Sequence, residues 1–117
     1  MPMTVLIVDD HPSFRATARA ILQAEGFDVI GEAENGVAGL RNAKELHPDV
    51  VLLDVQLPDF DGFEVASRLT RNGGGPRVVL TSSRDAADFG PLVAQSGAEG
   101  FVPKAELSGA ALKAVLE

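Results

Sequence analysis

Short apolar runs alternate along the chain with longer segments in which apolar residues recur at helical spacing. The first run, Val5 to Val8, is continuous and rich in β-branched residues, which is typical of a strand buried on both faces. The other runs that we predict to be strands are 28–31, which is weaker and typical of an edge, 50–53, 78–80 and 100–103.

The segments between these runs show helical periodicity. A helix is predicted over 12–25, with apolar residues that share one face. They are Phe14, Ala18, Ile21 and Leu22. A second helix is predicted to end near Leu46, because His47 precedes Pro48 and a residue before proline avoids the helical region. Its apolar residues, which we expect to face the core, are Val37, Leu40, Ala43 and Leu46.

Later helices are predicted over 63–71 and 108–116. The segment 84–98 is less regular, since Gly90-Pro91 interrupts any early helix there. Pro91 suits the first residue of a short helix that ends before the next strand, at Gly97.

Alternating strands and helices predict an α/β fold with a parallel sheet and helices on both faces. For five strands we favour a flavodoxin-like (βα)5 doubly wound sheet with the order 2-1-3-4-5, forming one domain over residues 1–117. In such a sheet the ligand site lies at the carboxyl ends of the strands, near the switch between strands 1 and 3.

Composition narrows the chemistry. The 117 residues include no cysteine and two histidines, His11 and His47, which excludes thiolate metal sites and cysteine nucleophiles. The formal net charge is −7 and the basic residues are scattered, so we expect no direct nucleic-acid binding by this domain. No apolar run approaches the roughly 20 residues of a membrane span, and no signal segment is visible. A cytoplasmic protein without membrane contact is expected.

Polar residues that carry chemistry follow the predicted strands. Strand 1 is followed by Asp9 and Asp10, strand 3 by Asp54, strand 4 by Thr81 and Ser82, and strand 5 by Lys104. A single aspartate at a strand end is common because it can cap the next helix. The whole combination is rare by chance, and it predicts a cluster at one sheet edge.

Clustered carboxylates are costly unless a cation lies among them, and oxygen ligands suit Mg²⁺. We expect Asp10 and Asp54 to bind Mg²⁺ directly and Asp9 to act mainly through a metal-bound water. Asp54, the solitary acid, is the best candidate for a phosphoryl acceptor. Ser82 and Lys104 would then bind the phosphoryl oxygens. No phosphate-binding glycine loop of the nucleotide-binding type is present.

These residues resemble the receiver domain of bacterial two-component response regulators, closest to those that precede a LuxR/NarL-type helix-turn-helix domain. The resemblance rests on V-L-I-V-D-D-H, V-V-L-L-D-V-Q-L-P-D-F-D-G, L-T-S-S and G-A-E-G-F-V-P-K, and it covers nearly the whole chain. It implies a phosphorylation switch that receives its phosphoryl group from a sensor histidine kinase and controls transcription. Such a domain is a phosphoacceptor rather than an enzyme, although it contributes to its own phosphoryl transfer and dephosphorylation.

The resemblance also implies residue roles. Asp54 is the phosphoacceptor, Asp9 and Asp10 form the acidic metal pocket, and the main-chain carbonyl of Gln56 completes the Mg²⁺ shell. The remaining roles fall to a phosphate-binding lysine, Lys104, a switch hydroxyl, Ser82 or Thr81, and an aromatic switch residue, Phe101. Phosphorylation would change the surface of the fourth helix, fifth strand and fifth helix, which can also support a homodimer.

Other interpretations stay open. The domain could dimerise or bind partners without phosphorylation. A phosphatase of the haloacid-dehalogenase type is disfavoured, because Gln56 stands where those enzymes have a second aspartate. A flavin site is disfavoured because the chain has no tryptophan or tyrosine. We expect His11 to face solvent in the first loop, and Asp59 and Asp61 to be turn residues.

Overall fold

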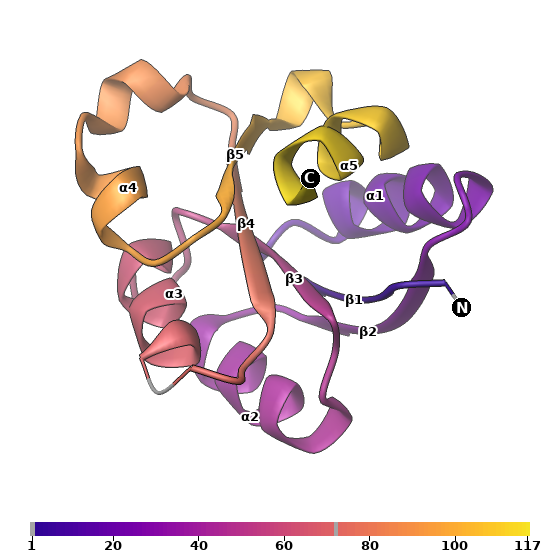
Figure 1. The fold of residues 1–117 in the computed structure, drawn as a ribbon, viewed down its shortest axis with the longest axis horizontal. Coiled ribbons are helices and arrows are strands. Elements are labelled where there is room, and N and C mark those ends of the chain that lie inside the picture. Colours follow the sequence, from indigo (N-terminus) through magenta and orange to yellow (C-terminus); the bar gives the residue numbers. More distant parts are fainter. Residues whose placement is uncertain (1, 72) are drawn as a thin grey trace.

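A computed structural model describes residues 2–71 and 73–117 and shows a five-stranded parallel sheet (Figure 1). The strands are β1 (Thr4–Val8), β2 (Asp28–Ala33), β3 (Val50–Asp54), β4 (Arg77–Ser82) and β5 (Gly100–Pro103). Their order is β2-β1-β3-β4-β5, which confirms the predicted flavodoxin-like (βα)5 sheet. The weak second run is indeed an edge strand, and it extends two residues beyond the predicted 28–31.

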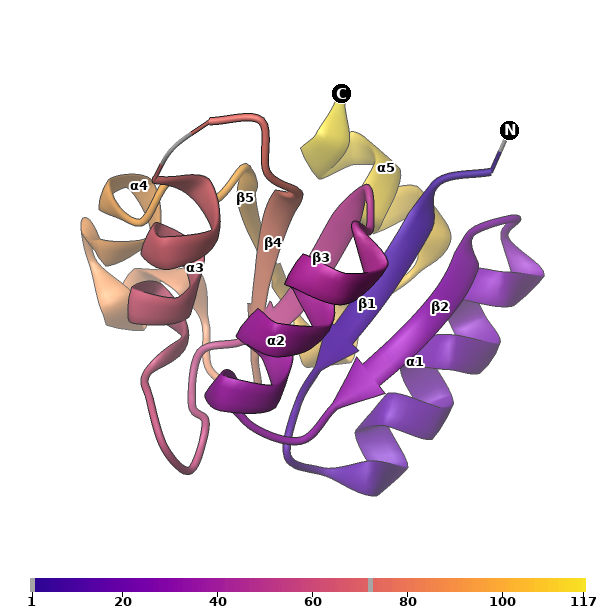
Figure 2. The ribbon, with the colours of Figure 1, turned by 90° about the horizontal axis from the view of Figure 1, so that it is seen from below.

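Helices cover both faces of this sheet. They are α1 (Pro12–Ala24), α2 (Gly36–Leu46), α3 (Gly62–Thr70), α4 (Leu92–Gln95) and α5 (Gly109–Leu116). Helices α1 and α5 pack on one face, and α2, α3 and α4 lie on the other, so that α2 crosses the near face in Figure 2 with α5 behind the sheet. Figure 2 also shows both chain ends at the edge where the strands begin.

Strand β1 shows why the apolar runs are continuous. Val5 and Ile7 belong to the core under α1 and α5, whereas Leu6 and Val8 belong to the core under α2 and α3. All four side chains are fully buried. Because successive side chains of a strand point to opposite faces, a strand with two covered faces needs apolar residues throughout.

Helix α2 departs from the prediction for its inward face. Val37 is 52% exposed, so its assignment is wrong. Leu46 is 41% exposed, but its Cδ1 lies 2.8 Å from the position of a Cβ on Gly31, so it does face the edge of the sheet. The buried residues are small: Gly36, Gly39 and Ala43. A Cβ added at Gly39 would lie 2.9 Å from the Val8 side chain, so the helix sits close to the sheet. Val37, about 100° round the helix from Gly36, is turned outward.

The segment between β4 and β5 is short of regular structure, as its sequence suggested. A 3₁₀ turn, Ala86–Phe89, ends at Gly90, whose φ of +56° suits glycine. Pro91 then directly precedes α4, which has a single turn of four residues. The predicted interruption at Gly90-Pro91 is therefore confirmed. Within the described residues, no helix is long and apolar enough to span a membrane.

Candidate functional site

The predicted polar residues meet at the carboxyl edge of the sheet. The Lys104 Nζ lies 2.6 Å from Asp9 Oδ2 and 3.4 Å from Asp54 Oδ2. Asp54 is the last residue of β3 and pairs in register with Thr81 of β4. Residues from β3, from the end of β5 and from the loop after β1 thus form one cluster at this edge.

The two carboxylates that contact Lys104 are buried. Asp9 is fully buried and Asp54 is 3% exposed, while the Lys104 side chain is 15% exposed. Asp9 Oδ2 touches the ammonium as an ion pair but has no aligned hydrogen bond. A single lysine therefore faces two buried negative charges, and the site has an excess of negative charge that favours a further cation.

The Asp54 carboxyl is electrostatically unusual. Its pKa is raised from 3.8 to about 6. Burial is the largest cause and the neighbouring Asp9 charge adds to it, while the Gln56 amide and Lys104 act to lower the pKa. The Gln56 amide donates to Asp54 Oδ1 over 3.1 Å. The fold thus holds the Asp54 carboxylate in a place where its negative charge is costly.

The donor set fits a divalent metal ion. Asp9, Asp10, His11 and Asp54 each offer a ligand atom, and these atoms lie within 4.8 Å of one another. Asp10 Oδ1 is buried without a hydrogen-bond partner, as is Asp9 Oδ2. Carboxylate oxygens that lie this close together without hydrogen-bond donors suit a hard ion such as Mg²⁺.

His11 is closer to this pocket than expected. Its side chain is 63% exposed, in line with the prediction, but its Nδ1 lies 3.1 Å from both Asp9 Oδ1 and Asp10 Oδ1. Its position directly after the acid pair was the only signal in the sequence.

The two candidate switch hydroxyls differ in their partners. The Thr81 hydroxyl donates to the buried carbonyl of Val102 over 2.7 Å and so ties β4 to β5. The Ser82 Oγ is buried and accepts a hydrogen bond from the Arg84 amide over 3.1 Å. No acceptor for the Ser82 proton is present among the described residues, which favours Ser82 as the mobile hydroxyl.

Phe14 packs against the lysine of the cluster. Its ring centroid lies 4.4 Å from Lys104 Nζ, within the range of a cation–π contact. Phe14 belongs to the first turn of α1, and it was predicted only as part of an apolar face. Lys104 is thus held between an aromatic ring and two carboxylates.

Phe101, the proposed aromatic switch residue, is half-buried at the end of a row of rings. Its ring centroid lies 5.8 Å from that of Phe89, which lies 5.5 Å from that of Phe63. These side chains come from β5, the 3₁₀ turn and α3. A change in the Phe101 rotamer would therefore alter contacts with both neighbouring elements.

The loop after Asp54 folds back onto β3 at Gly62. The Gly62 amide donates to the Val55 carbonyl over 2.6 Å, and a Cβ at Gly62 would lie 2.3 Å from the Asp54 carbonyl oxygen. No side chain fits there without displacing the backbone of the phosphoacceptor candidate. The sequence predicted no contact of this kind for Gly62, which stands only as the last residue of V-V-L-L-D-V-Q-L-P-D-F-D-G.

The acids of this loop lie in a turn, as predicted, and their carboxylates also cap two helices, which was not predicted. Asp61 accepts a hydrogen bond from the Glu64 amide at the start of α3. Asp59 accepts from the Gly36 and Val37 amides at the start of α2. Burial raises the pKa of Asp59, but these amide hydrogen bonds outweigh burial and hold that pKa below its usual value.

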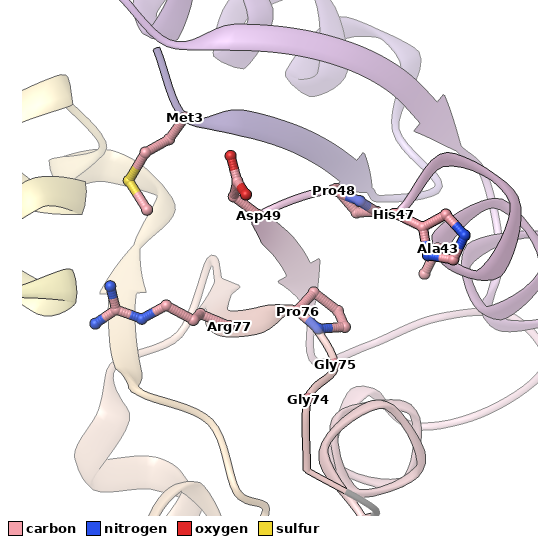
Figure 3. Close-up of a pocket in the computed structure, with 9 residues that line it drawn as sticks. All are labelled: Met3, Ala43, His47, Pro48, Asp49, Gly74, Gly75, Pro76 and Arg77. Carbon is pink, nitrogen blue, oxygen red and sulfur yellow. The ribbon is translucent and has the colours of Figure 1, made fainter. Parts of the chain in front are cut away.

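The acidic and basic side chains that line a hollow at the opposite, amino edge of the sheet have partners within the fold (Figure 3). Asp49 there accepts hydrogen bonds from the Thr4 amide and hydroxyl. Arg77 pairs with Glu99 and also donates to the Leu116 carbonyl. These charged side chains already have partners within the fold, so the carboxyl edge remains the better candidate site.

The sheet order, with an acidic pocket and a lysine at the carboxyl edge, defines the receiver class of flavodoxin-like signalling domains. The family model described as response regulator receiver domain matches residues 5–116, and the chain belongs to that family. Domains of this family generally serve as phosphoacceptors in signalling.

The descriptions of curated relatives support this family assignment. BvgA of Bordetella pertussis, described as a positive transcription regulator of virulence factors, is 44% identical over 102 residues, covering 87% of this chain and 49% of the relative. The response regulator GacA of Pseudomonas viridiflava is 37% identical over 101 residues, covering 86% and 47%. The chain thus spans about half the length of the curated relatives it matches.

Among solved structures, the signal receiver domain of NarL from Mycobacterium tuberculosis superposes with a TM-score of 0.86 at 34% identity, covering 98% of this chain and 97% of that chain. A LuxR-family response regulator from Aurantimonas gives 0.88 at 28% identity, covering 99% and 86%. The predicted resemblance to NarL- and LuxR-type receivers is confirmed.

Proposed function

We propose that this domain is a phosphorylation switch in which Asp54 accepts a phosphoryl group from the phosphohistidine of a sensor histidine kinase. The observation that carries the proposal is the buried Asp54 carboxylate, 3.4 Å from Lys104 Nζ and beside carboxylate oxygens of Asp9 and Asp10 that accept no hydrogen bond from the described residues. An acceptor, a phosphate-binding cation and metal-binding oxygens are then in one place.

Residues for Mg²⁺ are Asp10, Asp54 and the main-chain carbonyl of Gln56, with Asp9 acting through a metal-bound water. When bound, Mg²⁺ neutralises charge on the carboxylates and on the transferring group. That Gln56 lies beside the carboxylate is supported by its amide hydrogen bond to Asp54 Oδ1. Only oxygen donors are needed, which matches the preference of this ion.

In the transfer, an oxygen of the Asp54 carboxylate attacks phosphorus, an O–P bond forms, and the P–N bond to the kinase imidazole breaks. The electron pair of that bond leaves with the imidazole nitrogen, which takes a proton. Lys104 Nζ already touches Asp54 Oδ2 and so is placed to bind an oxygen of the new acyl phosphate. Burial limits access of bulk water to the product.

The conformational response is assigned to Ser82 and Phe101. The Ser82 hydroxyl can donate to a phosphoryl oxygen, because only its acceptor side is used by Arg84. Its movement would free space for Phe101 to turn inward and break its contact with Phe89. Phosphorylation biases an existing equilibrium between these arrangements. The altered surface would comprise α4, β5 and α5.

The output of this switch is proposed from its relatives. BvgA is described as a transcription regulator and is about twice the length of the matched segment, so we propose that residues 1–117 form one receiver domain that controls DNA binding by another domain. Binding to nucleic acid by this domain itself is not expected. A homodimer through α4, β5 and α5 and a cytoplasmic location stay predictions.

Phosphorylation is tested by incubating the protein with a small acyl phosphate and Mg²⁺ and measuring its intact mass. We expect one phosphoryl adduct on the wild type and none on Asp54→Asn, with Asp28→Asn as a matched control at an exposed position. An adduct that persists in Asp54→Asn would refute the acceptor assignment. A wild type that stays unmodified would favour a phosphorylation-independent binding module.

The variant Lys104→Ala distinguishes acceptance of the phosphoryl group from the conformational response to it. This variant should be phosphorylated slowly and should show a reduced NMR response to beryllofluoride, because the ammonium group that binds the phosphoryl oxygens is absent. An unchanged NMR shift pattern would contradict the role of Lys104.

A further inference from the structure

Phe14 lies beside the lysine that is proposed to bind the phosphoryl oxygens. We propose that Phe14 is a positioning residue for phosphoryl transfer, because its ring holds the Lys104 ammonium at the place where the acyl phosphate forms. This role rests on the proposed transfer to Asp54 and adds one residue to it. The ring should then act through Lys104, and the electron density of its face should set the size of the effect.

Two kinds of contact hold the Lys104 ammonium. Its Nζ lies 2.6 Å from Asp9 Oδ2 and 3.4 Å from Asp54 Oδ2. The same nitrogen lies 4.4 Å from the centroid of the Phe14 ring. The lysine side chain is 15% exposed, so water screens these contacts weakly. Because a cation–π contact is stronger when the cation is desolvated, the ring contributes to holding this ammonium.

The contact with the ring differs in kind from the contacts with the carboxylates. Before transfer, Lys104 Nζ is closer to Asp9 than to Asp54, the proposed acceptor. Binding an oxygen of the new acyl phosphate draws the ammonium from Asp9 toward the modified side chain. A hydrogen bond depends strongly on angle, whereas the ring attracts a cation across its whole negative face. The ring can therefore keep the ammonium in the site during this shift.

The fold fixes the position of Phe14. In the first turn of α1, the Arg15 amide donates to the His11 carbonyl over 3.1 Å, and the Arg15 guanidinium donates to the Asp9 carbonyl over 2.7 Å. The Phe14 side chain is half-buried and packs against the core under α1 and α5. The turn that begins at the lysine is followed by Leu107, which belongs to the same core. One core thus anchors both partners of the contact.

A second aromatic residue of this core provides a matched control. Phe27 is 6% exposed, and Lys113 Nζ lies 5.8 Å from the centroid of its ring. Phe27 directly precedes β2, so it lies at the amino edge of the sheet, whereas Asp54 ends β3 at the carboxyl edge. Phe27→Leu therefore also removes a ring beside a lysine, and it does so at a more buried position away from the site.

The test measures the initial rate at which acetyl phosphate and Mg²⁺ phosphorylate the protein, with intact mass as the readout. We expect Phe14→Leu to lower this rate by about 5- to 10-fold, the range that the loss of a partly buried cation–π contact gives. Phe27→Leu should lose stability because it leaves a cavity, but it should keep the rate of the wild type. Equal rates for Phe14→Leu and the wild type would overturn the proposal.

Two comparisons distinguish positioning from a purely structural role. In a Lys104→Met background, Phe14→Leu should cause no further loss of rate, because the ring has no ammonium to hold. The same loss in both backgrounds would refute the proposal. Replacing Phe14 with trifluorophenylalanine nearly preserves the size of the ring but withdraws electron density from its face, so this change should also slow the transfer. A wild-type rate with the fluorinated ring would equally refute the role.

A measurement on the wild type covers the case in which a variant fails to fold. In proton NMR, the ring current of Phe14 should shift the ε-methylene protons of Lys104 upfield, and more than those of Lys113, whose ammonium lies farther from its ring. Unshifted Lys104 protons would contradict the contact. A wild type that takes no phosphoryl group would refute the proposed function, whereas equal phosphorylation rates of the wild type and Phe14→Leu would refute the role of Phe14 alone.

Discussion

Replacing Asp54 with asparagine is expected to stabilise the protein at neutral pH when no metal is added. The pKa of Asp54 is raised by burial from 3.8 to about 6, so folding is penalised by the ionised carboxylate. At 1.36 kcal/mol per pKa unit, this difference amounts to about 3 kcal/mol at pH 7.5. The side chain is 3% exposed, so little of this penalty is screened by water.

The sign and the pH window follow from proton linkage. Between the unfolded pKa of 3.8 and the folded pKa of about 6, the folded state binds more protons, so the stability contributed by the Asp54 proton is lost as the pH rises. The stability difference between Asp54→Asn and the wild type should therefore grow from about pH 4 to about pH 6, with about half of it present near pH 5, and stay constant above about pH 7.

The assay is urea unfolding, together with thermal unfolding, in EDTA at several pH values, with circular dichroism as the readout. At pH 7.5 the thermal midpoint of Asp54→Asn should exceed that of the wild type by roughly 10 °C. Asp28→Asn makes the same change of charge at an exposed position and should show no such pH dependence. A difference that is flat between pH 5 and pH 8, or of opposite sign, would refute the reasoning.

Addition of Mg²⁺ should reverse the order of stability of Asp54→Asn and the wild type. Mg²⁺ that binds the folded wild type stabilises it by mass action, whereas Asp54→Asn lacks one charged ligand and gains less. EDTA should remove the gain completely. If Mg²⁺ stabilises both proteins equally, Asp54 is not a ligand.

Four further substitutions test the surroundings of Asp54. The first two, Phe14→Leu and Lys104→Met, are combined in a double-mutant cycle of urea unfolding. The free energies of unfolding should show a coupling of about 1 kcal/mol from the cation–π contact. Additive effects would contradict that contact. Thr81→Val leaves a buried carbonyl without its donor and should lower the free energy of unfolding by about 1–3 kcal/mol while phosphorylation persists. Ser82→Ala should have a smaller effect on stability but should lose most of the NMR response to beryllofluoride, and a full response would exclude it as the switch hydroxyl.

The sheet could be predicted from the sequence because buried strands leave a strong pattern of apolar residues. A strand covered on both faces, such as β1, must be apolar throughout, and the five apolar runs therefore gave the number and sequence of strands. The carboxyl-edge cluster followed from parallel topology alone. Helix α2 shows the limit: the apolar residue Val37 is exposed because glycines, which carry no hydropathy signal, make the close contact with the sheet.

Contacts between distant side chains could not be predicted in the same way. The approach of Phe14 to Lys104 joins the first turn of α1 to the end of β5, and no local pattern reports on such a pair. The capping of α2 by Asp59, 23 residues beyond Gly36, is equally non-local. The contact of His11 Nδ1 with Asp10 depends on the direction of the imidazole ring, which the sequence does not specify.

Gly62 has a consequence for how this domain tolerates mutation. Its hydrogen atom faces the Asp54 carbonyl oxygen at a distance where even one methyl group would collide with the backbone. In a saturation library selected for signalling, Gly62 should therefore be as intolerant as the phosphoacceptor, although it contributes no functional group. The exposed residues Pro58 and Asp59 come before it in the same loop. An engineer who exchanges this loop should therefore keep this glycine together with the Asp59 and Asp61 caps of α2 and α3.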